Sequence, residues 1–210
     1  MKIECFKAYD IRGQVPEQLN EEVAYRVGRA FADFLSAKQV VVGHDIRQSS
    51  PSLTDAVVRG LLDAGADVIH IGQCGTEEVY FSTFELGVDG GICVTASHNP
   101  INFNGMKLVR EGSRPISGDT GLDEVKRIAE TGDFKTPASP GDIAHKNMRP
   151  QYIQHLLGYI DSGAMTRKLR VLVNAGNGGA GAVIDGLEPH LPNVEFIKMH
   201  HVMTFFCVLS

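Results

Sequence analysis

Closely spaced cysteines are missing from this sequence. Its four cysteines are scattered along the chain without a CxxC pair, and that spacing offers neither a disulfide framework nor a zinc site. No stretch approaches the roughly 18 apolar residues that a membrane-spanning helix needs. The first residues lead into an ordinary strand rather than a signal peptide. We therefore expect a cytoplasmic protein without a membrane partner.

Long runs of one charge sign are missing as well. The formal net charge is −5 and no basic stretch stands out, so nucleic acid is not an expected partner. Hydrophobic residues make up 43% of the chain and charged residues 21%, which is typical of a globular protein. A chain of 210 residues has room for one full domain and part of a second.

Helix and strand patterns alternate over residues 1–133. Apolar residues at helical spacing predict helices over 17–37, 50–64, 77–86 and 117–131. Buried apolar runs predict strands over 39–43, 66–72, 90–95 and 105–109. Ser50 followed by Pro51 predicts a helix start with the serine as N-cap. The alternation predicts the α/β class, as a three-layer α/β/α domain with a mixed, largely parallel sheet.

The rest of the chain predicts a linker and part of a second, similar α/β domain. Residues 134–146 contain prolines and few large apolar residues, as an interdomain linker does. Residues 147–201 show a helix pattern and two strand patterns. The tail, 202–210, is mostly apolar, which is atypical of a chain end. We expect either a terminal strand that covers an exposed edge or the product of a shifted or prematurely ended reading frame.

A glycine motif in the second part admits two interpretations. Gly176 to Gly181 satisfies G-x-G-x-x-G between a strand and a helix, as a dinucleotide-binding turn does. Such a site also needs an acidic residue at the end of the next strand. Here that strand ends near Lys198, and its only acid, Glu195, lies near its start. We prefer a tight strand-to-helix turn, with a fragment of an NAD(P)-binding oxidoreductase as the alternative.

A polar loop follows the predicted strand 90–95. It contains Ser97, His98 and Asn99, and Pro100 keeps Asn99 out of the helical conformation. In open α/β sheets, ligands bind at the carboxyl ends of strands. Serine, asparagine and proline are also ordinary turn residues. From the residues alone, a turn and a ligand site remain equally open.

Charged residues follow two other predicted strands. Arg12 comes after a short first strand, and a guanidinium matches the geometry of phosphate oxygens. Asp45 and Arg47 follow the strand 39–43 and could orient the serine loop. The alternatives are a surface arginine and an exposed loop ion pair, which contributes little to stability.

Three motifs in order carry a resemblance to one family. Thr95–Pro100 resembles the phosphoserine loop of the α-D-phosphohexomutases, the bacterial phosphomannomutases and phosphoglucomutases. Asn104–Lys107 and Tyr9–Gly13 also fit that family. The resemblance extends to about His200, and family members are considerably longer. It implies a first domain over 1–133 and a second domain that ends, within 147–201, before the metal loop.

The resemblance implies a role for each candidate residue. Ser97 carries a phosphoryl group, which it exchanges with a sugar monophosphate through a hexose bisphosphate. Lys107 and Arg12 supply fixed positive charge, and His98 either moves a proton or orients the loop by a hydrogen bond. The remaining candidates support the site or bind phosphate; they are Tyr9, Asn99, Asp45 and Arg47.

The resemblance also implies Mg²⁺ and an activating hexose bisphosphate. Family members hold the metal with an Asp-Gly-Asp-Gly-Asp-Arg loop and a phosphoserine oxygen, so Ser97, through its phosphate, is the predicted metal ligand here. No Asp-x-Asp pair occurs in the sequence. We expect interconversion of mannose 6-phosphate and mannose 1-phosphate, or of the glucose phosphates, toward GDP-mannose, with little activity of this chain alone. A non-catalytic fragment is the alternative, and the oligomeric state stays open.

Overall fold

The computed structural model describes residues 1–161 and 165–202. The chain divides into two compact units, one formed by Met1–Lys146 and one that begins at Asn147. Apart from Val202, the predicted apolar tail lies outside the described residues. Among the residues that the structure describes, no helix is long and apolar enough to cross a membrane.

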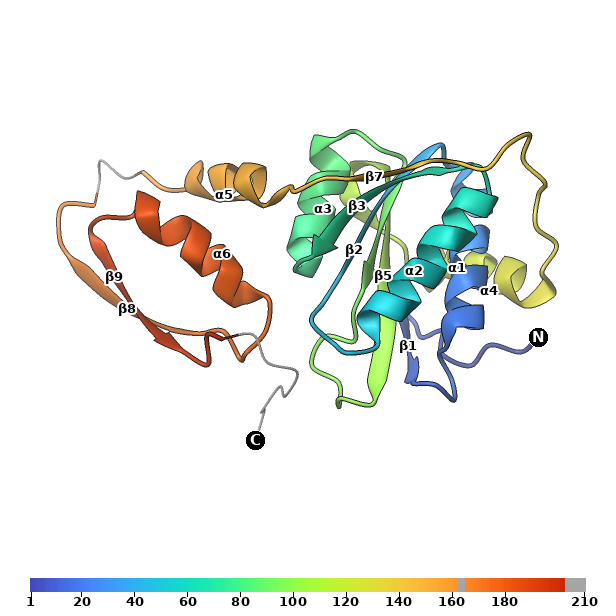
Figure 1. The fold of residues 1–210 in the computed structure, drawn as a ribbon, viewed down its shortest axis with the longest axis horizontal. Coiled ribbons are helices and arrows are strands. Elements are labelled where there is room, and N and C mark those ends of the chain that lie inside the picture. Colours follow the sequence, from blue (N-terminus) through green and yellow to red (C-terminus); the bar gives the residue numbers. More distant parts are fainter. Residues whose placement is uncertain (162–164, 203–210) are drawn as a thin grey trace. The chain divides into compact units, whose positions relative to one another are not determined.

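A seven-stranded sheet forms the centre of the first unit (Figure 1). The strand order is β1-β5-β4-β2-β3-β7, with β6 paired to β5. The strands are β1 (Ile11–Gln14), β2 (Gln39–His44), β3 (Asp67–Gln73), β4 (Gly90–Val94), β5 (Phe103–Arg110), β6 (Arg114–Pro115) and β7 (Ile143–His145). The pairs β4/β2, β2/β3 and β3/β7 are parallel, whereas β5 runs antiparallel to β1, β4 and β6. The predicted mixed sheet is therefore confirmed.

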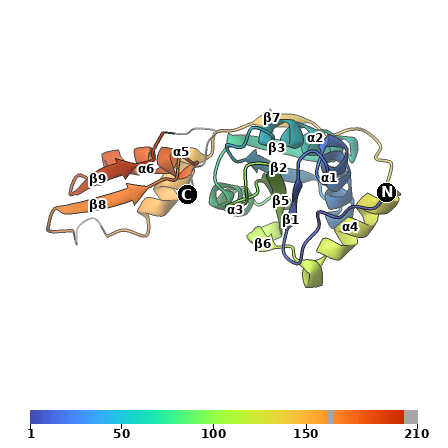
Figure 2. The same ribbon diagram turned by 90° about the horizontal axis from the view of Figure 1, so that it is seen from below.

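Helices cover both faces of this sheet (Figure 2). One face carries α1 (Glu21–Leu35), α2 (Ser50–Asp63) and α4 (Leu122–Thr131), and the other carries α3 (Thr76–Glu85). Two short 3₁₀ turns, η1 (Glu111–Ser113) and η2 (Gly118–Thr120), lie between β5 and α4. The predicted three-layer α/β/α architecture is thus confirmed for the first unit.

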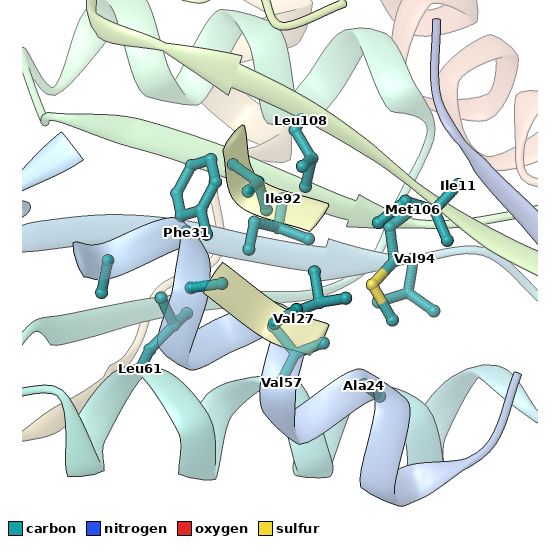
Figure 3. Close-up of a cluster of buried hydrophobic side chains, with 14 of the residues drawn as sticks. Ile11, Ala24, Val27, Phe31, Val57, Leu61, Ile92, Val94, Met106 and Leu108 are labelled. Atoms are coloured by element: carbon teal, nitrogen blue, oxygen red, sulfur yellow. The ribbon is translucent and has the colours of Figure 1, made fainter. Parts of the chain in front are cut away.

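The larger core lies between the sheet and the helices α1, α2 and α4. Val40 and Val42 of β2 face this core, whereas Val41 faces the smaller cluster beneath α3, as strand alternation requires. Figure 3 shows Val27 and Phe31 of α1 among side chains of the other core elements. All of these residues are buried, so the apolar stripe predicted for the first helix is confirmed.

The helices α1 and α2 cross at two glycines. A Cβ on Gly28 would collide with the carbonyl oxygen of Val57, and a Cβ on Gly60 would collide with that of Tyr25. In both cases the obstacle is backbone, which cannot rotate away as a side chain can. The close approach of these helices therefore depends on glycine at both positions.

Two local predictions for the first unit are wrong. Ser49, not Ser50, stands at the N-cap of α2, because Ser50 is already the first residue of the helix, and Ser49 makes no side-chain capping bond. The Ser50 hydroxyl instead donates a hydrogen bond to Asp45 Oδ1 at 2.5 Å. Part of the predicted linker 134–146 belongs to the sheet, since Ile143–His145 pair with β3 as an edge strand. The first unit accordingly extends to Lys146.

The second unit contains a two-stranded parallel sheet, β8 (Leu169–Asn174) and β9 (Val194–Met199). Its helices are α5 (Arg149–Leu157) and α6 (Ala180–Leu187), followed by a 3₁₀ turn, η4 (Glu188–His190). Lys198 and Met199 end β9, where a dinucleotide site needs an acid, and Lys198 bonds to Asp185 and Glu188, each at 2.7 Å. The glycine motif forms the turn from β8 to α6, with Gly176 at φ 57°. Gly176 therefore supplies the positive φ of a tight strand-to-helix turn.

Three histidines form a ladder across the first sheet. His70 of β3 lies beside His145 of β7, with ring centroids 5.1 Å apart, and beside His44 of β2, at 6.0 Å. The Gly72 amide donates to His70 Nδ1 at 3.2 Å, so that nitrogen carries no proton. Burial, followed by the neighbouring His145 and His44, lowers the pKa of His70 below its ordinary 6.5, against a smaller opposing effect of Asp55 on α2.

Acid is therefore expected to destabilise the first unit through His70. Because the pKa of His70 is lower in the folded state, the unfolded chain binds the proton more readily, and stability is lost as the pH falls below about 6.5. Urea unfolding at pH 7.5 and 5.5 should show a smaller pH dependence in His70→Gln than in the unmodified chain. His190→Gln, outside this sheet, should keep the full dependence; equal pH dependence in all three proteins would contradict the expectation.

Candidate active site at the carboxyl end of β4

The serine loop begins where β4 ends. Thr95 anchors it, since the Thr95 amide donates to the Gly105 carbonyl of β5 at 2.9 Å. The Ser97 amide donates to Thr95 Oγ1 at 2.9 Å, and Ser97 has a left-handed backbone with φ 55°. Such a conformation is uncommon for a residue other than glycine, and it often marks a functional position. It leaves the Ser97 side chain exposed to solvent.

His98 is the side chain nearest the serine hydroxyl among the contacts described for this loop. Ser97 Oγ and His98 Nδ1 lie 3.4 Å apart, within reach of a weak hydrogen bond. Neutral imidazole can accept a proton from the hydroxyl at this nitrogen. The geometry thus allows both roles predicted for His98, proton transfer and loop orientation.

Arg47 holds the serine loop through its backbone. Its guanidinium donates to the carbonyl oxygens of Ser97 at 3.0 Å, Asn99 at 2.5 Å, Pro100 at 2.8 Å and Phe103 at 3.0 Å. Only 11% of the Arg47 side chain is exposed. A charged donor makes stronger hydrogen bonds than a neutral one. Arg47 therefore fixes the loop conformation, and its N–H groups donate to the loop rather than to a ligand.

A buried polar network supports Arg47 from behind. Asp45 pairs with Arg47 Nε at 3.4 Å and accepts hydrogen bonds from the Arg47 amide and the Ser50 hydroxyl. Asn104, which is fully buried, donates to the hydroxyls of Ser49 and Ser50 at 2.8 and 2.9 Å. The network joins the loop after β2, the start of α2 and β5 behind the serine.

Sequence reasoning missed part of this network. It placed Asp45 and Arg47 as supports, but it gave Ser50 to helix capping and gave Asn104 and Ser49 no role. The only available signal was that Asn104 opens one of the family motifs. Its contacts with α2 depend on the packing of β5, which the local sequence does not reveal.

Two cations meet at a carboxylate beside the loop. Arg12 donates to Asp10 Oδ2 from Nε at 2.9 Å and lies at 2.8 Å from it through Nη2. Lys107 Nζ lies 3.7 Å from the same oxygen. Arg12 Nη1 also donates to Asn99 Oδ1 at 3.4 Å, which links the cations to the serine loop. The structure therefore brings together Arg12, Lys107 and Asn99, with Asp10 as a member that the sequence did not reveal.

Strand pairing produces this meeting of cations. Arg12 of β1 is the register partner of Gly105 on β5, two residues before Lys107. Ile11 and Met106 point into the core. Because side chains alternate along a strand, the next residues, Arg12 and Lys107, both project from the opposite face of the sheet. Their side chains are 26% and 30% exposed, which leaves both within reach of a solvent-borne anion.

Tyr9 lies apart from these contacts. It is 80% exposed and borders a hollow of about 540 Å³ that is also lined by Phe6, Gly118 and Asp123. Among the described residues, no hydrogen bond joins Tyr9 to the serine loop. In the described part of the chain, Tyr9 makes no hydrogen bond with the other candidate residues, and its role stays a prediction.

The side chains that the structure describes do not form a metal site by themselves. Within residues 1–161 and 165–202, no group of three histidine, cysteine, aspartate or glutamate side chains could hold a metal ion. Asp10 and Asp45, the carboxylates of the site, are engaged by Arg12 and Arg47. The phosphate predicted on Ser97 would therefore be the metal ligand that this part of the chain supplies.

The geometry defines a three-layer α/β/α domain with an exposed serine in a loop after β4, and Arg12 contacts that loop through Asn99. A family model described as phosphoglucomutase/phosphomannomutase, alpha/beta/alpha domain I, matches residues 4–136. The chain belongs to the phosphoglucomutase/phosphomannomutase family. This result confirms the resemblance inferred from the three motifs.

Individual relatives agree with the family match. A phosphomannomutase of Escherichia coli is 54% identical over 206 residues, covering 95% of this chain and 45% of that protein. A phosphomannomutase of Salmonella typhimurium is 56% identical over 206 residues, with the same coverage. A solved phosphoglucomutase/phosphomannomutase family protein from Burkholderia thailandensis is similar at a TM-score of 0.87 and 32% identity, covering 97% of this chain and 45% of that one. The chain spans about half the length of the curated relatives it matches.

Proposed function

We propose that Ser97 carries a phosphoryl group in the interconversion of mannose 6-phosphate and mannose 1-phosphate. The observation that carries this proposal is an exposed serine with a left-handed backbone, in a loop that Arg47 holds and that Arg12 contacts through Asn99. Arg12 shares the carboxylate of Asp10 with Lys107. The names of the relatives support the sugar: phosphomannomutases at 54% and 56% identity. Phosphohexose mutases of Xanthomonas campestris, at 50% identity, support hexose phosphates as the wider substrate class, and we include glucose phosphates in the proposal on that basis.

The transfer exchanges one phosphorus–oxygen bond for another. The bond from phosphorus to Ser97 Oγ breaks as a bond to a sugar hydroxyl forms, and the hydroxyl proton leaves with a base. In the reverse step, Ser97 Oγ gives its proton to His98 Nδ1 while it accepts the phosphoryl group of a hexose bisphosphate. The bond from phosphorus to the sugar oxygen breaks at the same time, and that oxygen takes back the proton from the base that had received it. Arg12 and Lys107 offset the charge of about −1.5 to −2 that a phosphoserine carries. Catalysis of this kind depends mainly on positioning and charge.

Mg²⁺ and a hexose bisphosphate activator belong to the same proposal. When bound, Mg²⁺ would neutralise phosphate charge, and the ligand from the described residues would be the phosphate of Ser97.

Cysteine chemistry is not an alternative at this site. Cys5 and Cys93 are buried, and burial raises the pKa of the Cys5 thiol to about 11, so it is protonated at neutral pH. The scattered cysteines support the proposed cytoplasmic location.

Phosphoryl transfer to Ser97 provides the test. The chain is incubated with a labelled hexose bisphosphate and Mg²⁺, and intact-mass and peptide analysis locate the label. We expect one phosphoryl group per chain on Ser97, none in Ser97→Ala, and unchanged labelling in Ser113→Ala, which removes another serine with positive φ (59°). We also expect no sustained turnover of mannose 1-phosphate, since the described residues hold no metal cluster.

Label on another residue, or labelling that survives Ser97→Ala, would refute the proposal. Absence of label from the folded chain would favour the alternative of a non-catalytic fragment. Dinucleotide binding is the other alternative from the sequence, and no observation favours it. The 206 residues shared with the E. coli phosphomannomutase extend well beyond the first domain, at 54% identity.

A further inference from the structure

We propose that Asp10 is a positioning residue that acts as the internal counter-anion of this site. Its carboxylate holds Arg12 and Lys107 together while Ser97 is unmodified, and an incoming phosphoryl group competes with it for both cations. The inference rests on the proposed function, since it takes Ser97 as the phosphoryl carrier. It assigns to Asp10 the control of how tightly the site binds phosphate.

A single oxygen of Asp10 collects all three described contacts. Arg12 reaches Oδ2 through Nε at 2.9 Å and through Nη2 at 2.8 Å, and Lys107 Nζ is 3.7 Å away. Arg12 sits on β1 and Lys107 on β5, so the carboxylate joins the strands through charge as well as through backbone pairing. A phosphate oxygen would offer the same two cations the same kind of acceptor.

The burial of the three side chains is uneven. Only 9% of the Asp10 side chain is exposed, against 26% for Arg12 and 30% for Lys107. A buried carboxylate needs partners, because an unpaired buried charge is costly. The cations, in contrast, keep a solvent-facing side. An anion at the serine loop can therefore approach Arg12 and Lys107, where it competes with the carboxylate of Asp10 for the same two cations.

Competition of this kind suits a reversible carrier. A phosphate that bound two uncompensated cations would be held tightly and released slowly. Asp10 subtracts one charge from the pair, so that the phosphoryl group can both arrive and leave. Arg47 does not share this behaviour, because its donors are directed at the loop carbonyls rather than at an anion.

Inorganic phosphate is the probe for the first experiment. Amide resonances of residues 97–99 in the full chain are followed during a phosphate titration at pH 7.5 and constant ionic strength. In Asp10→Asn, the amide oxygen can still accept from Arg12, but the competing charge is gone. We expect phosphate to bind about five- to tenfold more tightly than in the unmodified chain, as expected for removal of a like charge at close range.

Asp133→Asn is the matched control. Asp133 is exposed, follows α4 and loses the same charge on substitution, so it reports long-range effects alone. We expect its phosphate affinity to match that of the unmodified chain. If Asp10 were merely structural, Asp10→Asn would bind phosphate more weakly or equally well, and either result would overturn the inference. Failure of all three proteins to bind phosphate at these amides would overturn it as well.

A second measurement needs no variant. The Arg12 Nε–H resonance of the unmodified chain is followed in the same titration. We expect it to shift as phosphate saturates the loop, because phosphate competes with Asp10 for this donor. A resonance that stays in place at saturation would overturn the inference. Labelling of Ser97 is read separately: its absence would count against the proposed function, while the phosphate titration still decides the role of Asp10.

Discussion

Replacing Gly105 by alanine is expected to push β1 away from the sheet. A Cβ at this position would collide with the carbonyl oxygen of Ile11 and would lie 3.0 Å from the carbonyl oxygen of Thr95. Both obstacles are backbone, so no side-chain rotation relieves them. Overpacking of this kind commonly costs 1–3 kcal/mol, and we expect about 3 kcal/mol or more here because two strands must move. The free energy of unfolding in urea measures the loss.

The same substitution should impair the site more than its stability alone suggests. Gly105 is the register partner of Arg12, so displacement of β1 separates Arg12 from Lys107. We expect Ser97 labelling to fall even at temperatures where the variant remains folded. Gly118→Ala is the control, since its Cβ would lie 3.5 Å from the nearest atom and should change stability by less than about 0.5 kcal/mol. A Gly105→Ala protein as stable and as readily labelled as the control would contradict this account.

Arg47→Lys is expected to slow the labelling of Ser97 by about a hundredfold. Lysine keeps the positive charge but cannot reproduce the planar guanidinium, which bonds four loop carbonyls at once. The loop would lose the restraint that keeps Ser97 in its left-handed conformation. Displacement of a reacting group by about 1 Å can cost a factor of about 100 in rate. A labelling time course with a hexose bisphosphate measures the change.

The effect of Arg47→Lys should lie in the rate rather than in phosphate affinity. Arg12 and Lys107 remain in place, so inorganic phosphate should still bind. Arg114→Lys is a suitable control, because Arg114 is 61% exposed and pairs only with the exposed Glu111 in the described structure. Its labelling rate should equal that of the unmodified chain. Equal rates in Arg47→Lys and Arg114→Lys would show that the loop does not depend on the clamp.

Strong periodic patterns predicted most of the first unit. The apolar stripe of α1 and the apolar runs of β2 and β4 follow directly from burial, because each element has a face that must leave water. The strand β7 could not be found in this way. All three of its residues are exposed, and it is held by pairing with β3 rather than by apolar contact. A short edge strand of this kind leaves no hydrophobic pattern in the sequence.

The candidate site was predictable where one motif contains it and unpredictable where it depends on packing between elements. Ser97, His98 and Asn99 are neighbours in sequence, and the family resemblance singled them out. Asp10 meets Lys107 only because β1 pairs with β5 in one register. For Ser50, the local sequence predicts the wrong role. The Ser50-Pro51 pair favours helix capping, but the Ser50 hydroxyl donates to the charged acceptor Asp45, which packing brings close.

The crossing of α1 and α2 also constrains how this sequence can diverge. Gly28 faces the backbone of α2, and Gly60 faces the backbone of α1. A larger residue at one position cannot be accommodated by a smaller one at the other, because each obstacle is main chain. Neither glycine can therefore be replaced by a larger residue, and no second substitution relieves the clash. Both glycines should persist among descendants that keep this fold. Their invariance in an alignment would reflect the distance between two helices and not a role in phosphoryl transfer.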